Sequence, residues 1–319
     1  SDWDATGDPT MPGGEGSTGL NGAGTYDDNP RCSIIEIFNG RVVMSGKTDE
    51  PHNWFMSAIG DPLDWDINES IPEGGAVTGA GSSIGESSDP ITAFAPMTDD
   101  RLLMGGTNSI HILTGDPSNP STQLVSVSRD VGIVGQDAWC YGPNKSVFFM
   151  GENGLYNVQP NDFDIAQNNR VSLGKMDTTF TSIDFSSNRC RLIYDHSLYG
   201  VHIFLNPHTR DSNPLTHYFY DTRSDSFWTM EMPSIFGPTA AVDYQDLDPT
   251  ARKILLGGYD GHLRTFDNAA LDDDGTIIES YVWVGPIQIS GDREGKLTEL
   301  IAVLDEQTEG VGYGGGCKK

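Results

Sequence analysis

The chain has 319 residues, 36% of them hydrophobic, with 38 glycines, 18 prolines and a formal net charge of −27. This length suits one large repeat domain or two ordinary ones, and so much glycine and proline argues against a helical protein. So acidic a surface repels phosphate backbones, which argues against a protein that reads nucleic acid. No apolar run approaches the roughly 20 residues of a membrane-spanning helix. The sequence also opens without a basic-then-apolar signal peptide.

The two ends differ in composition from the remainder. Residues 1–30 are rich in Gly, Asp, Pro and Thr and hold few apolar side chains. Burial cannot offset the entropy of ordering such a segment, so we expect an extended arm that contacts the rest of the chain or a neighbour. We expect a β-propeller over 31–305 and a flexible, glycine-rich tail over 306–319.

Between these ends, turn residues separate short runs that are either apolar or alternate between apolar and polar residues. Asn39-Gly40 separates two of the runs and is a strong hairpin signal. The segment 67–90 reads as a loop, and 165–188 as a short helix or an insertion. An aromatic–Asp–polar turn–Trp pattern over 217–228 resembles the outer hairpin of a kelch-type blade. The strand-like runs are 33–38, 41–46, 54–59, 91–96, 122–127, 138–141, 190–195, 199–205, 217–220 and 239–244.

One hairpin pattern occurs three times, at 102–113, 147–158 and 254–266. Each copy reads as an apolar run, a glycine, an Asn or Asp followed by Gly or Ser, and an alternating run. An Asn/Asp-Gly pair can adopt the positive φ angles of a primed two-residue turn, whose twist matches the flanking strands. The repeat therefore predicts an all-β protein built from similar hairpins.

The spacing of the repeat predicts the architecture. Glycines 46, 106 and 151 mark units of about 45 to 60 residues with three or four strands each, which suggests propeller blades rather than a solenoid. Five units are visible. A sixth would combine 280–284, 287–289 and 297–304 with an early strand and close the ring. We expect about six blades, with five or seven as alternatives and a β-sandwich as the alternative fold.

Phosphate-binding loops are absent from the sequence, and its histidines never pair at HExxH spacing, although a zinc site assembled across blades stays an alternative. The stretches 79–85 and 291–297 miss the spacing of dinucleotide and Walker loops. His111 and His262 fall on the second arm of the repeated hairpin and are expected on a blade face, whereas His202 and His217 are expected on the more polar sides of strands. The cysteines lack CxxC spacing and predict neither a zinc site nor a disulfide framework. They are Cys32, Cys140, Cys190 and Cys317.

The acidic stretches of the sequence match known binding or catalytic motifs only in part. Residues 64–68 match the first three ligand positions of a calcium loop, but Glu69 replaces the turn glycine and Gly75 the bidentate glutamate. The stretch 271–275 reads as a solvated acidic turn, and adventitious calcium at such turns stays an alternative. Residues 128–132 match the start of a sialidase Asp-box, without its Thr and Trp and in one copy. We therefore assign no catalytic, cofactor-binding or metal-binding residue.

Three stretches together carry a family resemblance. They are 54–65 with "GDP-x-DW", 109–117 with "LTGDP", and 129–135 with "GIVG". In this order they resemble β-propeller structural proteins of tailed bacteriophages, which are tail or head-to-tail components and include nozzle-like proteins. The resemblance covers about residues 32–305, and none of its phrases is a catalytic signature.

The resemblance implies a non-enzymatic virion protein without cofactors, located in the tail after synthesis in the host cytoplasm. Its partners would be other copies of itself in a ring and neighbouring tail or connector proteins, with phage DNA as transiting cargo. Acidic side chains along such a passage would prevent DNA adhesion. A propeller that binds a host-surface glycan or protein is the alternative, and a propeller glycosidase is a further one.

Overall fold

The computed structural model divides the chain into two units, Ser1–Thr276 and Ile277–Lys319, and all but one of the described residues belong to the first. The predicted arm (1–30), sixth blade (280–304) and tail (306–319) lie outside the described residues. The structure describes residues 32–62, 64–65, 73–80, 82, 84–119, 121–160, 165, 169–209, 216–233, 236–245, 247–248, 252–267, 270, 272–273 and 276–277.

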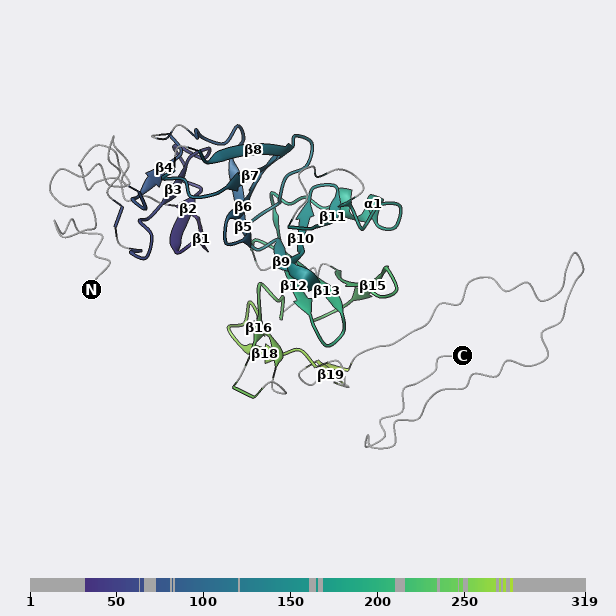
Figure 1. Ribbon diagram of the computed structural model, residues 1–319. Coiled ribbons are helices and arrows are strands. Elements are labelled where there is room, and N and C mark those ends of the chain that lie inside the picture. The colour runs from purple at the N-terminus through teal and green to yellow at the C-terminus, as the bar shows by residue number, and fades with distance from the viewer. Residues whose placement is uncertain are drawn as a thin grey trace, which may run out of the picture. The chain divides into compact units, whose positions relative to one another are not determined.

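Two four-stranded antiparallel sheets come first along the chain, and each strand pairs with the next (Figure 1). The first sheet consists of β1 (Ile34–Phe38), β2 (Arg41–Ser45), β3 (Trp54–Met56) and β4 (Val77–Thr78). The second consists of β5 (Ile91–Thr98), β6 (Arg101–Gly106), β7 (Ile110–Thr114) and β8 (Gln123–Ser128).

Three further sheets repeat this meander. The third contains β9 (Trp139–Tyr141), the 3-10 turn η1 (Pro143–Lys145), β10 (Val147–Gly151) and β11 (Gly154–Val158). The fourth contains β12 (Asn188–Asp195), β13 (Gly200–Pro207), β14 (His217–Asp221) and β15 (Ser226–Met230). The fifth contains β16 (Ala240–Tyr244), β17 (Lys253–Gly257) and β18 (Leu263–Thr265). The short strands β19 (Asp272–Asp273) and β20 (Thr276–Ile277) pair with each other.

The α-helix α1 (Asp177–Thr181) lies between the third and fourth sheets in the chain, inside the segment predicted as a helix or insertion. With five residues it is far too short to cross a bilayer, and no helix in the described part of the chain could do so.

All three predicted copies of the hairpin are confirmed. They are the pairs β6–β7, β10–β11 and β17–β18, with Met104 opposite His111, Phe149 opposite Tyr156 and Leu255 opposite Thr265. The predicted turn at Asn39-Gly40 is also present. Its φ angles of 48° and 71° are the positive values that a primed turn requires.

Buried side chains fill the spaces between successive sheets. Phe38 of β1 and Phe94 of β5 share one core, and Phe149 of β10 and Val201 of β13 share another. The first strands of successive sheets also contact each other, β1 with β5, β9 with β12, and β12 with β16. Consecutive meanders that pack in this way are the construction of a β-propeller, and the predicted all-β, propeller-type class is confirmed. The blade number stays a prediction.

The first two sheets are joined by a buried ion pair. Arg41 of β2 is 1% exposed and pairs with Asp116, which follows β7, at 2.8 Å between Nη2 and Oδ1. Its Nη1 also donates to the carbonyl oxygens of Ser57 and Gly75, each at 2.6 Å. One guanidinium therefore satisfies acceptors from both sheets and from the loop before β4.

Residues 131–137, which we call the connector, join the second, third and fourth sheets. The Ile133 N–H donates to the carbonyl of Gly106 in β6, and the Val134 N–H donates to that of Met150 in β10, both at 3.0 Å. At its far end, Asp137 forms an ion pair with Arg191 of β12. The connector begins two residues after β8 and contains the "GIVG" phrase.

Gly132 of the connector provides a first prediction. A Cβ at this position would overlap the backbone carbonyl oxygens of Gly106 and Thr107, whereas a Cβ on Gly135 would have no atom within 4 Å. We expect Gly132→Ala to lower the free energy of unfolding by about 3 kcal/mol because the backbones must separate. Gly135→Ala should stay within about 1 kcal/mol of wild type, on the stabilising side. Urea denaturation measures both, and equal effects would contradict the close approach at Gly132.

The buried ion pair provides a second prediction. Asp116→Ala leaves the Arg41 charge buried without its carboxylate, and should lower the free energy of unfolding by about 3 kcal/mol. The control is Asp221→Ala, which removes the partner of Arg223, whose side chain is 62% exposed. That change should cost clearly less because water screens the pair, although it also removes the acceptor of the Arg223 N–H in the turn. Similar losses in thermal and urea denaturation would show that Arg41 does not depend on Asp116.

Candidate functional site

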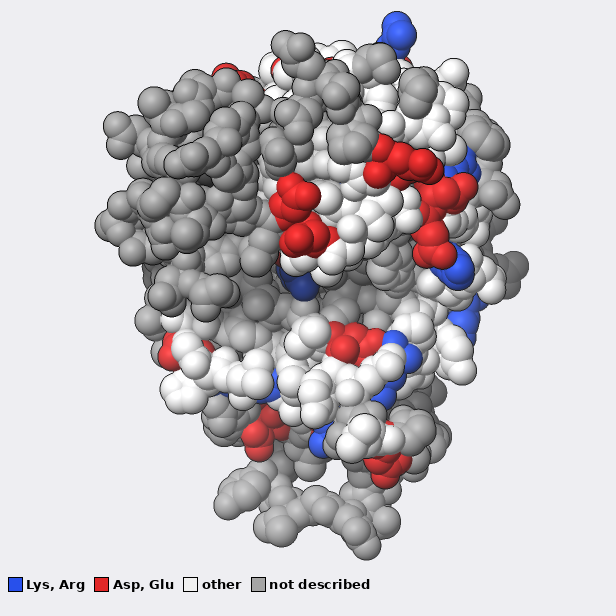
Figure 2. Space-filling model, turned by 60° about the vertical axis from the view of Figure 1, so that its left-hand side comes forward, with Lys and Arg blue, Asp and Glu red and all other residues white. Residues whose placement is uncertain are grey.

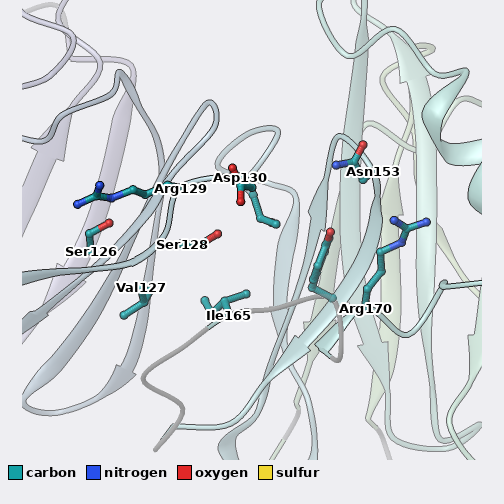
Figure 3. A pocket seen from close by; sticks show the side chains of 10 residues that line it. Ser126, Val127, Ser128, Arg129, Asp130, Asn153, Ile165 and Arg170 are labelled. Atoms are coloured by element: carbon teal, nitrogen blue, oxygen red, sulfur yellow. The ribbon is translucent and has the colours of Figure 1, made fainter.

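A pocket of about 460 Å³ lies between the second and third sheets (Figure 3). Its walls come from the end of β8, the beginning of the connector, the β10–β11 hairpin and the segment before α1. The lining residues are Ser126, Val127, Ser128, Arg129, Asp130, Val131, Asn153, Tyr156, Ile165 and Arg170.

An irregularity in β8 shapes one wall. The pairing of β7 with β8 shifts register, so that Ile110 is opposite Ser128 while His111 is opposite Ser126, and Val127 has no partner. Such a bulge disrupts the ladder locally and redirects neighbouring side chains. The carbonyl of Val127 instead accepts the N–H of Ile165 at 3.1 Å, which fixes a buried apolar residue in the lining.

The β10–β11 hairpin forms the opposite wall. Tyr156 is stacked on Phe149 of the paired strand, with ring centroids 5.2 Å apart and planes within 5° of parallel. Burial raises the pKa of Tyr156, although Arg170 beside it acts in the opposite direction, so the hydroxyl is protonated at neutral pH. Arg170 itself forms an ion pair with Asp177 at the start of α1. Tyr156 and Arg170 are therefore fixed by packing and charge.

The polar groups nearer the surface face solvent. In the part of the chain that the structure describes, the side chains of Ser126, Ser128, Asp130 and Asn153 make no hydrogen bond and no ion pair. Figure 3 shows Ser128 and Asp130 on one side of the pocket, Asn153 on the other, and the guanidinium groups of Arg129 and Arg170 at opposite sides. The lining therefore contains hydroxyl, carboxylate, amide and guanidinium groups.

Arg129 differs from the other arginines. Nine arginines fall within the described residues, and every one except Arg129 has a hydrogen bond or an ion pair there. The other eight are Arg41, Arg101, Arg170, Arg189, Arg191, Arg223, Arg252 and Arg264. An unpaired guanidinium is notable in a chain with 46 acidic residues and only 19 lysines and arginines.

The pocket suits binding better than glycoside hydrolysis. Most glycosidases place two carboxyl groups on either side of the bond that they cleave. Among the lining residues Asp130 is the one carboxylate, and neither a histidine nor a cysteine lines the pocket. The described lining residues can hold a polar molecule by hydrogen bonds, and among them there is no pair of carboxyl groups.

The motifs singled out from the sequence have mixed outcomes. The Asp-box-like stretch 128–132 forms one wall of the pocket, so that motif marked the location. In the calcium-like stretch 64–68, residues 66–68 lie outside the described residues, and Trp65 is buried with its Nε1 donating to Pro62 at 3.0 Å. Of the acidic turn 271–275, Asp272 and Asp273 form β19. No group of three or more potential metal ligands occurs among the described residues.

The remaining motif predictions concern loops and cysteines. The stretch 291–297 lies outside the described residues, and the described part of 79–85 contains no strand or helix. Cys190 is buried, whereas Cys32 and Cys140 are half-buried, and all three are free thiols. Burial raises the pKa of Cys32 to about 11 and that of Cys140 and Cys190 further, so these thiols are protonated at neutral pH.

The prediction that His202 and His217 lie on the more polar sides of their strands is wrong. They are 0% and 3% exposed, because the side of β13 and β14 that they occupy packs toward the fifth sheet. His202 lies 3.3 Å from the Asp195 carboxylate. Burial raises the pKa of Asp195, but hydrogen bonds from His202 and Ser197 hold it below its ordinary value. Of the hairpin histidines, His111 is on β7 as predicted, and His262 precedes β18 in the turn.

His217 provides a prediction about pH. Its Nδ1 accepts the N–H of Leu205 at 3.1 Å, and burial lowers its pKa from 6.5 to about 4. Because the unfolded state takes up this proton first, stability should fall as pH drops from 6.5 toward 4, by roughly 3 kcal/mol in total. His217→Asn retains an acceptor and should flatten that part of the pH profile. Urea denaturation of the wild type and the variant at several pH values tests this, and equal pH profiles would contradict the role of His217.

Comparisons with known proteins add a loose structural likeness. No family model and no curated protein matches the sequence. The extracellular domain of a protein described as a one-component system from Bacteroides thetaiotaomicron aligns with a TM-score of 0.45 and 14% identity over 77% of this chain and 27% of that one. The GH74 xyloglucanase of Xanthomonas campestris gives 0.39 and 10%, over 77% and 39%. A luciferin-regenerating enzyme gives 0.39 and 9%, over 73% and 72%.

The chain thus spans about a quarter of the length of the first of these proteins and less than half of the xyloglucanase. At these TM-scores and identities the likeness concerns the general arrangement of sheets. No activity, ligand or partner passes from those proteins to this chain.

Proposed function

We propose that the chain is a non-enzymatic structural protein of a tailed-bacteriophage virion. It would be a tail or head-to-tail component, nozzle-like, that assembles with other copies into a ring around the path of the DNA. The observation that carries the proposal is the structural role of the three phrases that resemble the phage family, because each of them holds sheets or turns together.

The residues of these phrases make packing contacts. In the stretch with "GDP-x-DW", Trp54 at its start and Trp65 at its end are 0% and 4% exposed. In "LTGDP" the aspartate is Asp116, the partner of Arg41 at the first sheet junction. In "GIVG" the first glycine, Gly132, allows the connector to approach β6, and Ile133 is fully buried. Such use of the shared residues is expected of a scaffold, and none of them forms a nucleophile–base pair.

The charge of the chain supports a role beside DNA. Acidic side chains form several exposed groups on the face seen in Figure 2, with basic side chains among them. With a net charge of −27 the surface repels a polyanion at low ionic strength. A passage lined by such copies would let DNA move without adhesion.

The pocket favours a second candidate function, recognition of a ligand on the host surface. Its lining brings polar side chains of β8 and of the β10–β11 hairpin to one hollow. The two functions are compatible, since one protein of a tail can both scaffold and bind.

Localisation tests the proposal directly. We expect mass spectrometry to find the chain in purified particles of the tailed phage whose genome encodes it. Immunogold labelling should place the chain on the tail. Negative-stain images of the purified protein, alone or with its neighbouring tail proteins, should show rings. Absence from the particles together with a monomer under every condition would contradict the proposal.

The protein's behaviour toward DNA gives a further prediction. The purified chain should not retard duplex DNA in a gel at low salt, where non-specific binding is strongest. A basic protein that binds duplex DNA non-specifically serves as the positive control. Retardation that weakens steeply as salt rises would mean that the chain presents a basic DNA-binding face, and would contradict a non-adhesive passage.

A further inference from the structure

The junction between the fourth and fifth sheets has the smallest of the described cores that join successive sheets. It contains five buried side chains, against 26 in the core that the second, third and fourth sheets share. The five are Ile193, Phe204, Ala241, Ile254 and Leu256. A unit with few buried apolar contacts opens at a lower free energy than the rest of a protein. We propose that acid releases the fifth sheet from the fourth, with His217 as the group that takes up the proton.

His217 lies where a charge would weaken this junction. It is 3% exposed, on the side of β14 that packs toward the fifth sheet, and its ring centroid is 5.7 Å from that of Phe204 in the small core. The backbone pairing of β13 with β14 ends at Ile203 and Tyr218. Just beyond that pair, the His217 Nδ1 accepts the N–H of Leu205 at 3.1 Å. A proton on Nδ1 would remove this acceptor and put a charge against the core.

The other titratable groups of the junction keep a partner or contact with water as the pH falls. His202 lies 3.3 Å from the Asp195 carboxylate, so its charged form has a partner. Burial and the nearby Arg252 lower the pKa of His196, but this side chain is exposed, so opening changes its surroundings less. Three ion pairs hold further charges, Arg191 with Asp137, Asp243 with Arg252, and Arg264 with Asp260, whereas Glu231 and Lys253 are exposed.

The polar links across the junction do not respond to acid. The Asn206 side chain donates to the carbonyl of Pro238, and Arg191 donates to that of Ala241, each at 2.7 Å. The Tyr259 hydroxyl donates to the carbonyl of Pro207. None of these three donors changes its charge between neutral and mildly acidic pH. They align the fifth sheet on the fourth, and the pH dependence of the junction therefore comes from His217.

The direction of the effect follows from linkage. In the closed form burial lowers the pKa of His217 from 6.5 to about 4, so its imidazole is neutral there. In an open form the ring contacts water and takes up a proton at its ordinary pKa. The population of the open form should therefore rise about 30-fold between pH 7.5 and pH 5.

Hydrogen exchange of the full chain, followed by mass spectrometry, tests the proposal. Protection factors at pH 7.5 and pH 5 are compared, because they cancel the intrinsic pH dependence of exchange. We expect the protection of β16 and β17 to fall about 30-fold at the lower pH. The internal reference is β10, because neither it nor its partners β9 and β11 contain a histidine, and its protection should change little.

Two variants separate the proton from the packing. His217→Asn keeps an acceptor for the Leu205 N–H but cannot be protonated, and should remove most of the pH dependence in β16 and β17. Phe266→Ala removes a ring of the fifth sheet whose centroid is 4.6 Å from that of His202. It should lower the protection of β16 and β17 by a similar factor at both pH values and leave β10 unchanged. Circular dichroism confirms that both variants are folded.

Three outcomes would overturn the proposal. In the first, β16 and β17 lose protection only together with β10, in the wild type or in Phe266→Ala. In the second, their protection is the same at both pH values. In the third, His217→Asn keeps the full pH dependence. The proposal does not rest on the virion assignment, since localisation and ring formation are tested separately.

Discussion

The structure depends on sheets that bury both of their faces. An antiparallel sheet commonly keeps one face in water. In this protein every residue of β6 and β10, and every residue of β13 except the last, is buried. Each inner sheet can do this only with a neighbour on either side, so a chain of sheets must continue from one to the next. The apolar side chains between them supply the stability, and the polar links such as Arg41–Asp116 and the connector fix how each sheet meets the following one.

This constraint explains which features the sequence predicted. The three hairpins were recognisable because glycine and Asn/Asp turns punctuate apolar runs, and both signals are local. The placement of His202 and His217 was wrong because strict alternation assumes one solvated face, whereas the second face of β13 packs toward the fifth sheet. The pairing of Arg41 with Asp116, 75 residues apart in the chain, depends on tertiary packing and leaves no local signal.

The candidate site shows the same division. The Asp-box-like stretch at 128–132 pointed to one wall of the pocket, although its match was partial and its role differs. Asn153 and Tyr156 looked like ordinary members of a repeated hairpin, and only the packing of the second sheet beside the third brings them to that wall. The register shift that frees the carbonyl of Val127 has no sequence signature, because Val and Ser on either side fit a regular strand equally well.

Scaffold and binding are thus separated within each sheet. Residues that face a neighbouring sheet are fixed by packing, and in the proposed virion role they carry no chemistry. Groups at strand ends and turns are free to differ between related proteins without disturbing the cores. The exposed Arg129 is of this second kind.

The meander order has a consequence for how the chain is made. Each sheet is completed by strands that follow one another directly, and the connector that joins the second sheet to the third emerges between them in sequence. Contacts within a sheet therefore join neighbouring segments of the chain, whereas the cores between the sheets join segments that are farther apart in sequence. During synthesis the sheets can form in succession from the N-terminal side, each new one condensing on the face of the last.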